Sequence, residues 1–245
     1  MKKDIEAWQS LTHVCRQWRT VVFGSPRRLN LRLFCAAKTQ TPVRDTLDIW
    51  PALPLVIRCS VYETEEADNI IAVLEHSDRV CYIGLSNLSH SDHVLAAMQK
   101  PFPELTRLKL YSYKLATIVP DSFLGRSAPR LQFLRLDGIP FPGLPKLLLS
   151  ATHLVTLHLS NIPHSGYILL EVIITALPTL TSLETLGLGF RSHGSFPDRE
   201  SPRPPPLTRS VLPVLTKLYL EQLNGYLEDF MQASWPSSIP PNSPP

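Results

Sequence analysis

The 245-residue sequence lacks the features that mark a membrane-spanning or secreted protein. Its longest apolar run, YILLEVIITAL, has eleven residues and contains a glutamate, so it is too short to span a bilayer. The opening residues, MKKDIEAW, have no apolar stretch of the kind that a signal peptide requires. We therefore expect no membrane segment and a location in the cytoplasm or the nucleus.

The sequence also has few aromatic residues, 8%, and no pair of cysteines in a CxxC motif. Its four cysteines are widely spaced and sit in apolar runs, at Cys15, Cys35, Cys59 and Cys81. This placement predicts buried thiols in a reducing compartment rather than disulfides. Because 44% of residues are hydrophobic and leucine recurs throughout, we expect a sizeable aliphatic core.

Motifs of catalysis are missing as well. There is no G-x-S-x-G elbow, and Gly187, Gly189 and Gly194 do not fit G-x-G-x-x-G. We expect Gly187 and Gly189 at exposed strand positions instead. His90 and His93 are three residues apart, but no third metal ligand lies near them in sequence. The sequence therefore predicts no enzymatic activity, no cofactor and no metal site.

The net charge of +3 is unevenly distributed along the chain. Residues 1–44 contain nine Lys or Arg and two acids, a net charge of +7, and the remainder has 15 bases and 19 acids, a net charge of −4. The basic segment has no interleaved aromatic residues that could stack on bases, so nucleic-acid binding is not expected. A polar protein partner fits this distribution better.

Eight segments share an apolar pattern, and the later ones fit L-x-x-L-x-L, as in LTRLKLYSY, LQFLRLDGI and LVTLHLSNI. The first residue of each alternating pair is, in order, Leu31, Ile57, Ile83, Leu108, Leu134, Leu157, Leu186 and Leu218. These positions are separated by 26, 26, 25, 26, 23, 29 and 32 residues. A period near 26 with this strand signature is typical of a leucine-rich repeat.

Stretches with helical periodicity lie between the predicted strands. TEEADNIIAVLEHSDR starts at Thr64 as a cap, with acids in the first turn. Similar patterns occur at 89–100 and 165–177, a weaker one occurs at 142–151, and 225–235 could cap the C-terminal end. One repeat cannot cover its own apolar face, so neighbouring repeats must stack.

The predicted fold is thus an α/β leucine-rich-repeat solenoid, with parallel strands on the concave face and helices outside. It extends over residues 29–235 and has a loop insert near 191–207. Residues 236–245 form a proline-rich tail that we expect to be disordered.

A further helix is predicted over residues 4–23, where apolar residues recur at steps of three and four, at Trp8, Leu11, Cys15, Trp18 and Val22. Gly24 and Pro26 end it. By periodicity alone, this amphipathic helix caps the first repeat.

The same segment, LTHVCRQWRTVVFGSPRRLNL, resembles the C-terminal half of an F-box. The resemblance rests on Val14, Cys15, Arg16, Trp18, Arg19, Pro26 and Leu29. From about residue 8 to 225 the chain resembles the F-box/leucine-rich-repeat proteins that are abundant in mushroom-forming fungi. The resemblance implies that residues 1–28 are a partial F-box-like segment that docks on the Skp adaptor of a cullin ubiquitin ligase, whereas the repeats hold the protein to be ubiquitinated. Trp8, Leu11, Val14 and Trp18 are the candidates for this adaptor-facing or capping helix.

An F-box normally begins with a Leu-Pro-x-Glu helix about twenty residues upstream, and here Met1 directly precedes KKDIEAWQS. Either the sequence is truncated or the protein lacks this docking element. The second alternative makes it a stand-alone leucine-rich-repeat scaffold or decoy without ligase attachment.

The outward residue of each repeat defines a candidate partner surface. In each predicted strand, one outward residue lies between two inward residues, and these outward residues are Arg32, Arg58, Gly84, Lys109, Arg135, His158, Gly187 and Tyr219. The next outward row includes Phe34, Tyr111, Asp137 and Glu221. We expect partner binding at Arg32, Arg58, Lys109, Tyr111, Arg135, His158 and Tyr219. Two interpretations stay open: the polar row keeps an exposed sheet soluble, or it forms a groove that prefers an acidic partner.

Overall fold

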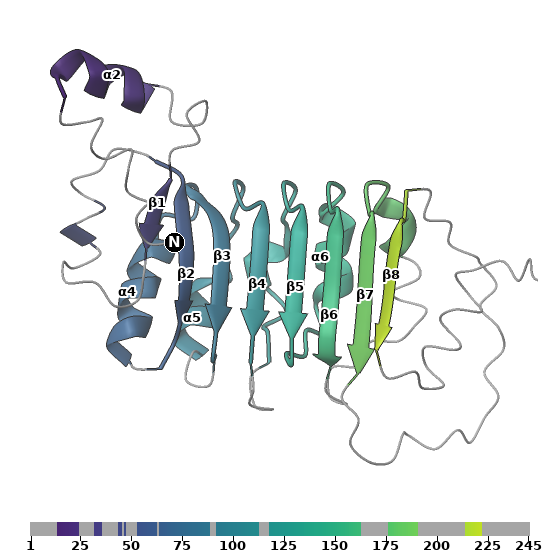
Figure 1. The fold of residues 1–245 in the computed structure, drawn as a ribbon. Coiled ribbons are helices and arrows are strands. Elements are labelled where there is room, and N and C mark those ends of the chain that lie inside the picture. The colour runs from purple at the N-terminus through teal and green to yellow at the C-terminus, as the bar shows by residue number, and fades with distance from the viewer. Residues whose placement is uncertain are drawn as a thin grey trace, which may run out of the picture.

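A computed structural model describes residues 14–24, 32–35, 44–45, 47, 53–62, 64–88, 92–112, 118–162, 176–190 and 214–221. Within these ranges the strands form one open, all-parallel sheet of eight strands in sequence order (Figure 1). The strands are β1 (Leu33–Cys35), β2 (Leu55–Ser60), β3 (Val80–Ser86), β4 (Arg107–Tyr111), β5 (Phe133–Asp137), β6 (Thr156–Ile162), β7 (Thr185–Phe190) and β8 (Lys217–Glu221).

Short helical elements cover one face of this sheet and leave the other face open (Figure 1). They are α4 (Thr64–Leu74), α5 (Asp92–Ala97), the 3-10 turn η1 (Phe123–Arg126), α6 (Leu144–Ser150) and the 3-10 turn η3 (Leu177–Thr179). A further helix, α2 (Arg16–Gly24), lies beyond the β1 end of the sheet (Figure 1). The predicted α/β class, with helical segments alternating with parallel strands, is therefore confirmed.

The helix α4 begins at Thr64, the residue that was predicted as its cap, and the predicted acids follow it. Glu65 and Glu66 lie in the first turn, where acids interact favourably with the helix dipole. Glu66 is 3% exposed, and its Oε2 accepts a hydrogen bond from the backbone N–H of Tyr62 at 2.6 Å. The helices predicted within 89–100 and 142–151 are present as α5 and α6. Most of 165–177, the insert near 191–207, the helix at 225–235 and the tail at 236–245 fall outside the described residues.

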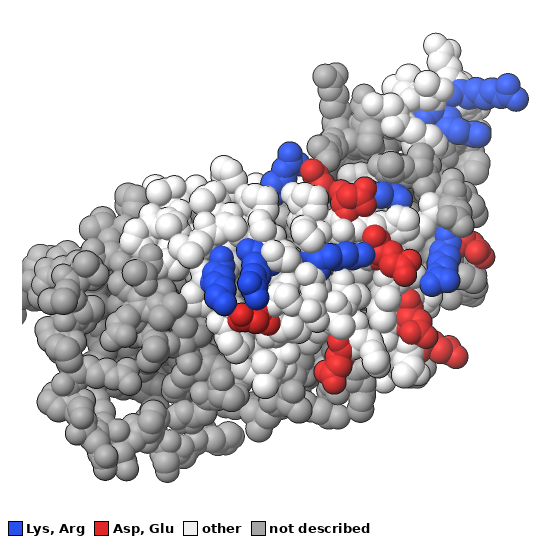
Figure 2. All heavy atoms as spheres, turned by 180° about the vertical axis from the view of Figure 1, so that it is seen from behind, with Lys and Arg blue, Asp and Glu red and all other residues white. Residues whose placement is uncertain are grey.

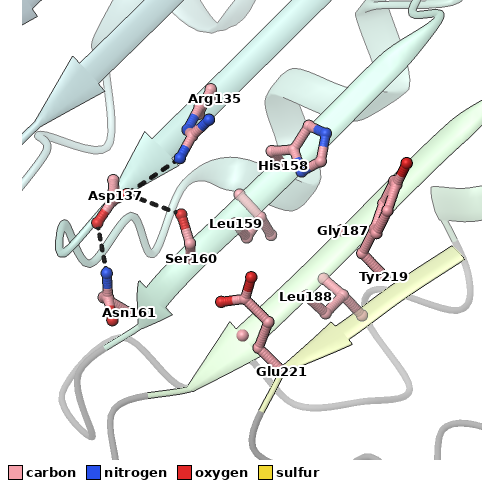
Figure 3. Close-up of a pocket in the computed structure, with 11 residues that line it drawn as sticks. Arg135, Asp137, His158, Leu159, Ser160, Asn161, Gly187, Leu188, Tyr219 and Glu221 are labelled. Carbon is pink, nitrogen blue, oxygen red and sulfur yellow. Dashed lines mark hydrogen bonds and ion pairs between the residues drawn. The ribbon is translucent and has the colours of Figure 1, made fainter.

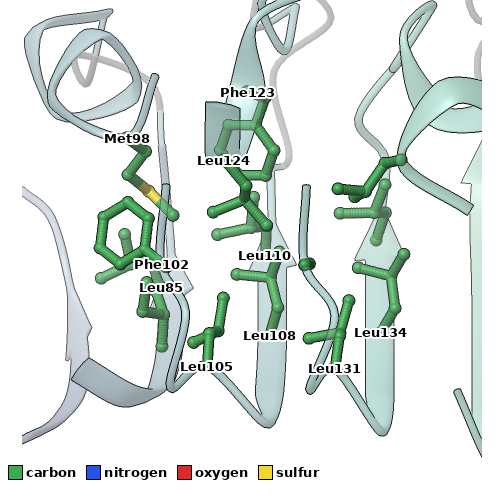
Figure 4. Packing of buried hydrophobic residues seen from close by; sticks show 14 of the residues in the cluster. Leu85, Met98, Phe102, Leu105, Leu108, Leu110, Phe123, Leu124, Leu131 and Leu134 are labelled. Carbon is green, nitrogen blue, oxygen red and sulfur yellow. The ribbon is translucent and has the colours of Figure 1, made fainter. Parts of the chain in front are cut away.

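The predicted alignment of the repeats is correct from β2 to β8. The inward residues pair in register as Ile57 with Ile83, then Leu108, Leu134, Leu157, Leu186 and Leu218. Leu108, Leu134 and Leu157 are each 0% exposed. Figure 4 shows how Leu105, Leu108 and Leu110 of one repeat lie beside Leu131 and Leu134 of the next. Equivalent leucines thus form continuous buried columns beneath the helical layer.

The predicted register of the first repeat is wrong. Cys35, not Leu31, is the residue aligned with Ile57, and Leu33 is aligned with Leu55. The pattern LNLRLFC alternates over its whole length, and a shift by an even number of residues keeps every side chain on its face, so alternation could not fix this register. As a result, Arg32 precedes β1 and does not lie in the row of Arg58.

The other first-repeat residue placed on the outward face also moves with this correction. Phe34 is aligned with Val56, and therefore lies two outward rows before Ser60 and Tyr111. Phe34 remains exposed at 41%.

The chain turns sharply at the end of several strands. The φ angle is positive at Asn87 (56°) and Gly138 (70°), directly after β3 and β5, and at Asn161 (52°), near the end of β6. Asn and Gly are the residue types that adopt this left-handed conformation at least cost. At Gly138 an added Cβ would collide with the backbone oxygen of Ser112, so only glycine fits between these neighbouring turns.

Candidate functional site

The register brings seven outward residues into one row across the open face, which we call the central row. Its members, in order from β2 to β8, are Arg58, Gly84, Lys109, Arg135, His158, Gly187 and Tyr219. Five of the seven predicted surface residues lie in this row, and Tyr111 lies in the neighbouring row beside Asp137. Arg32 is the predicted residue that the register does not bring there.

Each cation of the central row rests on an aromatic ring. Arg58 Cζ lies 5.0 Å from the ring centroid of Tyr82, Lys109 Nζ 4.7 Å from Phe133, and Arg135 Cζ 5.3 Å from Tyr111. Arg58 Nη2 also donates a hydrogen bond to Tyr82 Oη at 3.4 Å. Such contacts are favourable and hold a flexible cation in one position.

Tyr82 and Phe133 were missed by the sequence interpretation. Both occupy the outward row that precedes the central row, where Tyr82 aligns with Arg107 and Arg107 with Phe133. The alternation of side chains along each strand predicts that both residues face the open side. Only the pairing of neighbouring strands shows that their rings lie under cations of the central row.

Gly84 creates the space for the first of these stacks. A Cβ on Gly84 would lie 2.8 Å from Tyr82 Cε1, so the Tyr82 ring lies across the glycine. The ring is 7% exposed although it is on the outward side of the sheet. The glycine between Arg58 and Lys109 is therefore part of the cation–aromatic arrangement.

Arg135 is held on a second side by a polar cluster. Its Nη2 is 3.4 Å from Asp137 Oδ2, and Asp137 also accepts hydrogen bonds from Ser160 Oγ at 3.0 Å and Asn161 Nδ2 at 2.7 Å (Figure 3). The stack on Tyr111 and this ion pair together restrict where the guanidinium can lie. Arg135 is nevertheless 39% exposed, so it can reach a bound partner.

His158 continues the row as an uncharged ring. It lies between Phe133 and Tyr219, with centroid distances of 6.5 Å and 5.8 Å. Partial burial lowers the pKa of His158 from its usual value, the positive charge of Arg135 lowers it further, and Glu221 opposes the shift. The lowered pKa favours the neutral form of the ring at neutral pH.

A hollow of about 260 Å³ opens at the β6–β8 end of the face (Figure 3). Gly187 and Gly189 of β7 form part of its lining, with Arg135 and Asp137 on one side and Tyr219 and Glu221 on the other. The two glycines were expected at exposed positions and are buried instead. They are buried because His158 lies across Gly187 and Glu221 lies across Gly189.

The opposite, helical face has a different arrangement of charge. Figure 2 shows acids and bases next to one another on that face. Asp121 lies 2.9 Å from Lys146 Nζ and 3.8 Å from Arg126 Nη2, and Arg130 Nη1 lies 2.7 Å from Glu104 Oε2. Exposed pairs of this kind neutralise one another, whereas Arg58 and Lys109 are stacked on rings without an acidic partner in the described part of the chain.

The helix α2 and the two residues before it, Val14 and Cys15, have a largely exposed apolar surface. Val14 is 63% exposed, Trp18 50% and Val21 57%, although Phe23 packs partly against the core. The stripe that was predicted to cap the first repeat therefore faces outward where it is described. Trp8 and Leu11 lie outside the described residues.

The four cysteines are free thiols, but the prediction that all four are buried is wrong. Cys35 is buried, Cys59 and Cys81 are half-buried, and Cys15, which directly precedes α2, is exposed. Burial raises the pKa of the Cys35 thiol to about 11, so it is protonated at neutral pH.

The described ranges also bear on metal binding and membrane insertion. Those ranges contain no group of three His, Cys, Asp or Glu side chains that could hold a metal ion. They also contain no helix with the length and apolar character needed to cross a membrane. Comparisons with protein-family models, curated proteins and solved structures gave no match.

Proposed function

We propose that this protein is a leucine-rich-repeat protein of the F-box type, and that it acts as the substrate-recognition subunit of a Skp–cullin–F-box ubiquitin ligase. In this proposal the open sheet face binds an acidic segment of a target protein and α2 belongs to the attachment to the adaptor. The chain presents a target and performs no catalysis. The unbroken register of Ile57, Leu108 and Leu218 with their neighbours supports the repeat assignment.

The observation that carries the binding proposal is the set of stacked cations in the central row. Arg58, Lys109 and Arg135 project from β2, β4 and β5 on a face that the described helices leave uncovered. A cation already restrained by an aromatic ring loses less conformational entropy on binding than a free one. Arginine and tyrosine are also the residue types that dominate the binding energy of many interfaces.

Solubility alone gives a weaker account of this surface. An exposed sheet needs polar outward residues, but it does not need three cations in register on three aromatic rings. An acidic partner segment would complement their charge and replace the water around the rings. The proposal therefore favours a partner with carboxylates or phosphates over a neutral one.

The exposed apolar side chains of α2, together with Val14 just before it, support the attachment proposal. Val14, Trp18 and Val21 are each at least half exposed, and burying them against a partner would remove apolar surface from water. In the F-box resemblance this helix lies in the part of the chain that belongs to the adaptor-binding module. The alternative, a scaffold or decoy without ligase attachment, leaves these side chains without an adaptor to cover them.

A pull-down with a purified Skp-type adaptor tests the attachment. We expect the full-length protein to retain the adaptor and Trp18→Ala to weaken retention at least about tenfold, because an interface tryptophan often contributes 2 kcal/mol or more. The affinity can be measured by titrating the immobilised protein with adaptor.

Tyr62→Ala is the matched control, because Tyr62 is an exposed aromatic residue, at 62%, that lies outside α2. This variant should bind the adaptor like the wild type. No binding by the natural full-length product would remove the ligase proposal and favour the stand-alone scaffold.

A further inference from the structure

The hollow over β7 is shaped by side chains that lean in from both neighbouring strands. An added Cβ at Gly187 would collide with His158 Nδ1, and one at Gly189 would lie 3.1 Å from Glu221 Oε2. His158 comes from β6 and Glu221 from β8, so both strands depend on the glycines of β7 for this arrangement. Figure 3 shows the Glu221 carboxylate directed over β7, with the rings of His158 and Tyr219 at the other end of the hollow.

The charge of the hollow is negative, in contrast to the rest of the central row. Arg135 (+1) and Asp137 (−1) form an ion pair, and Glu221 adds −1, so the sum over these three charged groups is −1. Within the described residues Asp137 has three donors around it, whereas Glu221 makes no hydrogen bond or ion pair. The Glu221 carboxylate is therefore available to an incoming cation.

The ring of Tyr219, which lines the hollow, is also available to an incoming cation. Tyr82, Phe133 and Tyr111 each have a cation of this chain over the ring. In the described part of the chain Tyr219 has only the His158 ring beside it, and it is 49% exposed. A ring face next to an unpaired carboxylate is a favourable environment for a guanidinium or ammonium group.

We propose that the hollow is a subsite for one arginine or lysine side chain of the bound protein, with Glu221 as its counter-ion and Tyr219 as its aromatic wall. This proposal rests on the proposed function, since it concerns the same face of the sheet. It changes the expected target from a uniformly acidic segment to one that has a base at one end and an acid at the other.

The strand spacing sets the separation of the two charges. Gly187 in β7 is two strands from Arg135 and three from Lys109. Neighbouring strands are about 4.8 Å apart, so a base in the hollow lies about 10–14 Å from an acid over these cations. An extended peptide that crosses the strands covers this distance with about three to four residues.

The subsite can be tested on the full-length protein with N-acetyl-arginine amide as the probe and N-acetyl-citrulline amide as its neutral isostere. The His158 ring signal in an NMR titration reports binding, because the ring borders the hollow. We expect a saturable shift with the arginine probe, about fivefold weaker binding of the citrulline probe, and about fivefold weaker binding of the arginine probe to Glu221→Gln. Glu75→Gln, which removes an acid directly after α4 in the helical layer, should bind like the wild type.

Equal affinity for the two probes, an unchanged affinity in Glu221→Gln, or no saturable shift would overturn the subsite. A peptide of six glutamates, applied to the same variants, separates this outcome from failure of the proposed function. If Glu221→Gln binds the glutamate peptide like the wild type while the arginine probe fails to bind the wild type, the subsite proposal is wrong and the acidic-partner proposal stands. If the arginine probe binds the wild type and the glutamate peptide does not, the subsite proposal stands and the acidic-partner proposal is wrong.

Discussion

We expect Leu134→Ala to lower the free energy of unfolding by about 3 kcal/mol, within a range of roughly 2–5 kcal/mol for such substitutions at buried sites. Leu134 is 0% exposed and its neighbours in register, Leu108 and Leu157, are equally buried. Removing its branched end leaves a cavity in the middle of the buried column, which the rigid strands on both sides cannot close. Urea unfolding followed by circular dichroism measures the change.

Leu149→Ala provides the matched control, because Leu149 lies on α6 and is 55% exposed. The same substitution there should change the free energy of unfolding by no more than about 0.5 kcal/mol. Similar effects at the two positions would mean that Leu134 does not occupy the interior of a stacked core. A loss confined to Leu134 would agree with the column seen in Figure 4.

The second large effect concerns binding. We expect the triple variant Arg58→Glu, Lys109→Glu and Arg135→Glu to bind a peptide of six glutamates at least about 100-fold more weakly than the wild type. Each exposed ion pair contributes up to about 1 kcal/mol, and reversing the charge replaces attraction by repulsion at three positions of the same row. Fluorescence anisotropy at low ionic strength measures the affinity, and added salt should weaken wild-type binding because exposed charges are screened.

A second triple variant, Lys100→Glu, Arg126→Glu and Lys146→Glu, makes the same change in net charge outside the central row. It should bind the peptide within about threefold of the wild type, since only long-range electrostatics differ. Because a glutamate at 135 would face Asp137, Arg58→Gln with Lys109→Gln serves as a milder variant that leaves the Arg135–Asp137 ion pair intact. Unchanged binding by both central-row variants would show that the row serves solubility alone.

The repeats were predictable because two periods coincide in this sequence. Alternation along each strand assigns Leu108 inward and Lys109 outward, and a repeat near 26 residues fixes which strands are equivalent. Alternation failed at the first repeat, where LNLRLFC gives the same pattern in two registers. There, contacts with β2 decide the register, and Cys35 takes the position assigned to Leu31.

For the candidate site, the sequence predicted which residue types lie in the central row, but not the contacts that their side chains make. The sequence placed Arg58, Lys109 and Arg135 together, but the rings of Tyr82 and Phe133 join them only through side-chain directions across strands. No pattern in the sequence predicts the hollow over β7. Gly187 looked like an exposed strand position, and its role depends on His158 from the neighbouring strand lying over it.

For α2, the sequence predicted the helix but not the surface that it packs against. Its apolar periodicity predicted a helix, which the structure describes from Arg16 to Gly24. Periodicity identifies an apolar stripe but does not say what covers it. Here Trp18 and Val21 are exposed, so the helix does not use them to cap the sheet.

The central claim is that successive repeats place equivalent outward residues side by side, so that the cations form one row. Disulfide cross-linking of Lys109→Cys with Arg135→Cys, in a Cys15→Ser background, tests it most directly. These positions are partners in register, and neighbouring strands about 4.8 Å apart lie within the Cα distance that a disulfide needs. We predict rapid formation of this bond under mild oxidation, detected by peptide mass spectrometry, and little bond formation between Lys109→Cys and Asp137→Cys, which is two residues out of register. Equal cross-linking of the two pairs, or cross-linking of the offset pair alone in a folded protein, would contradict the aligned row.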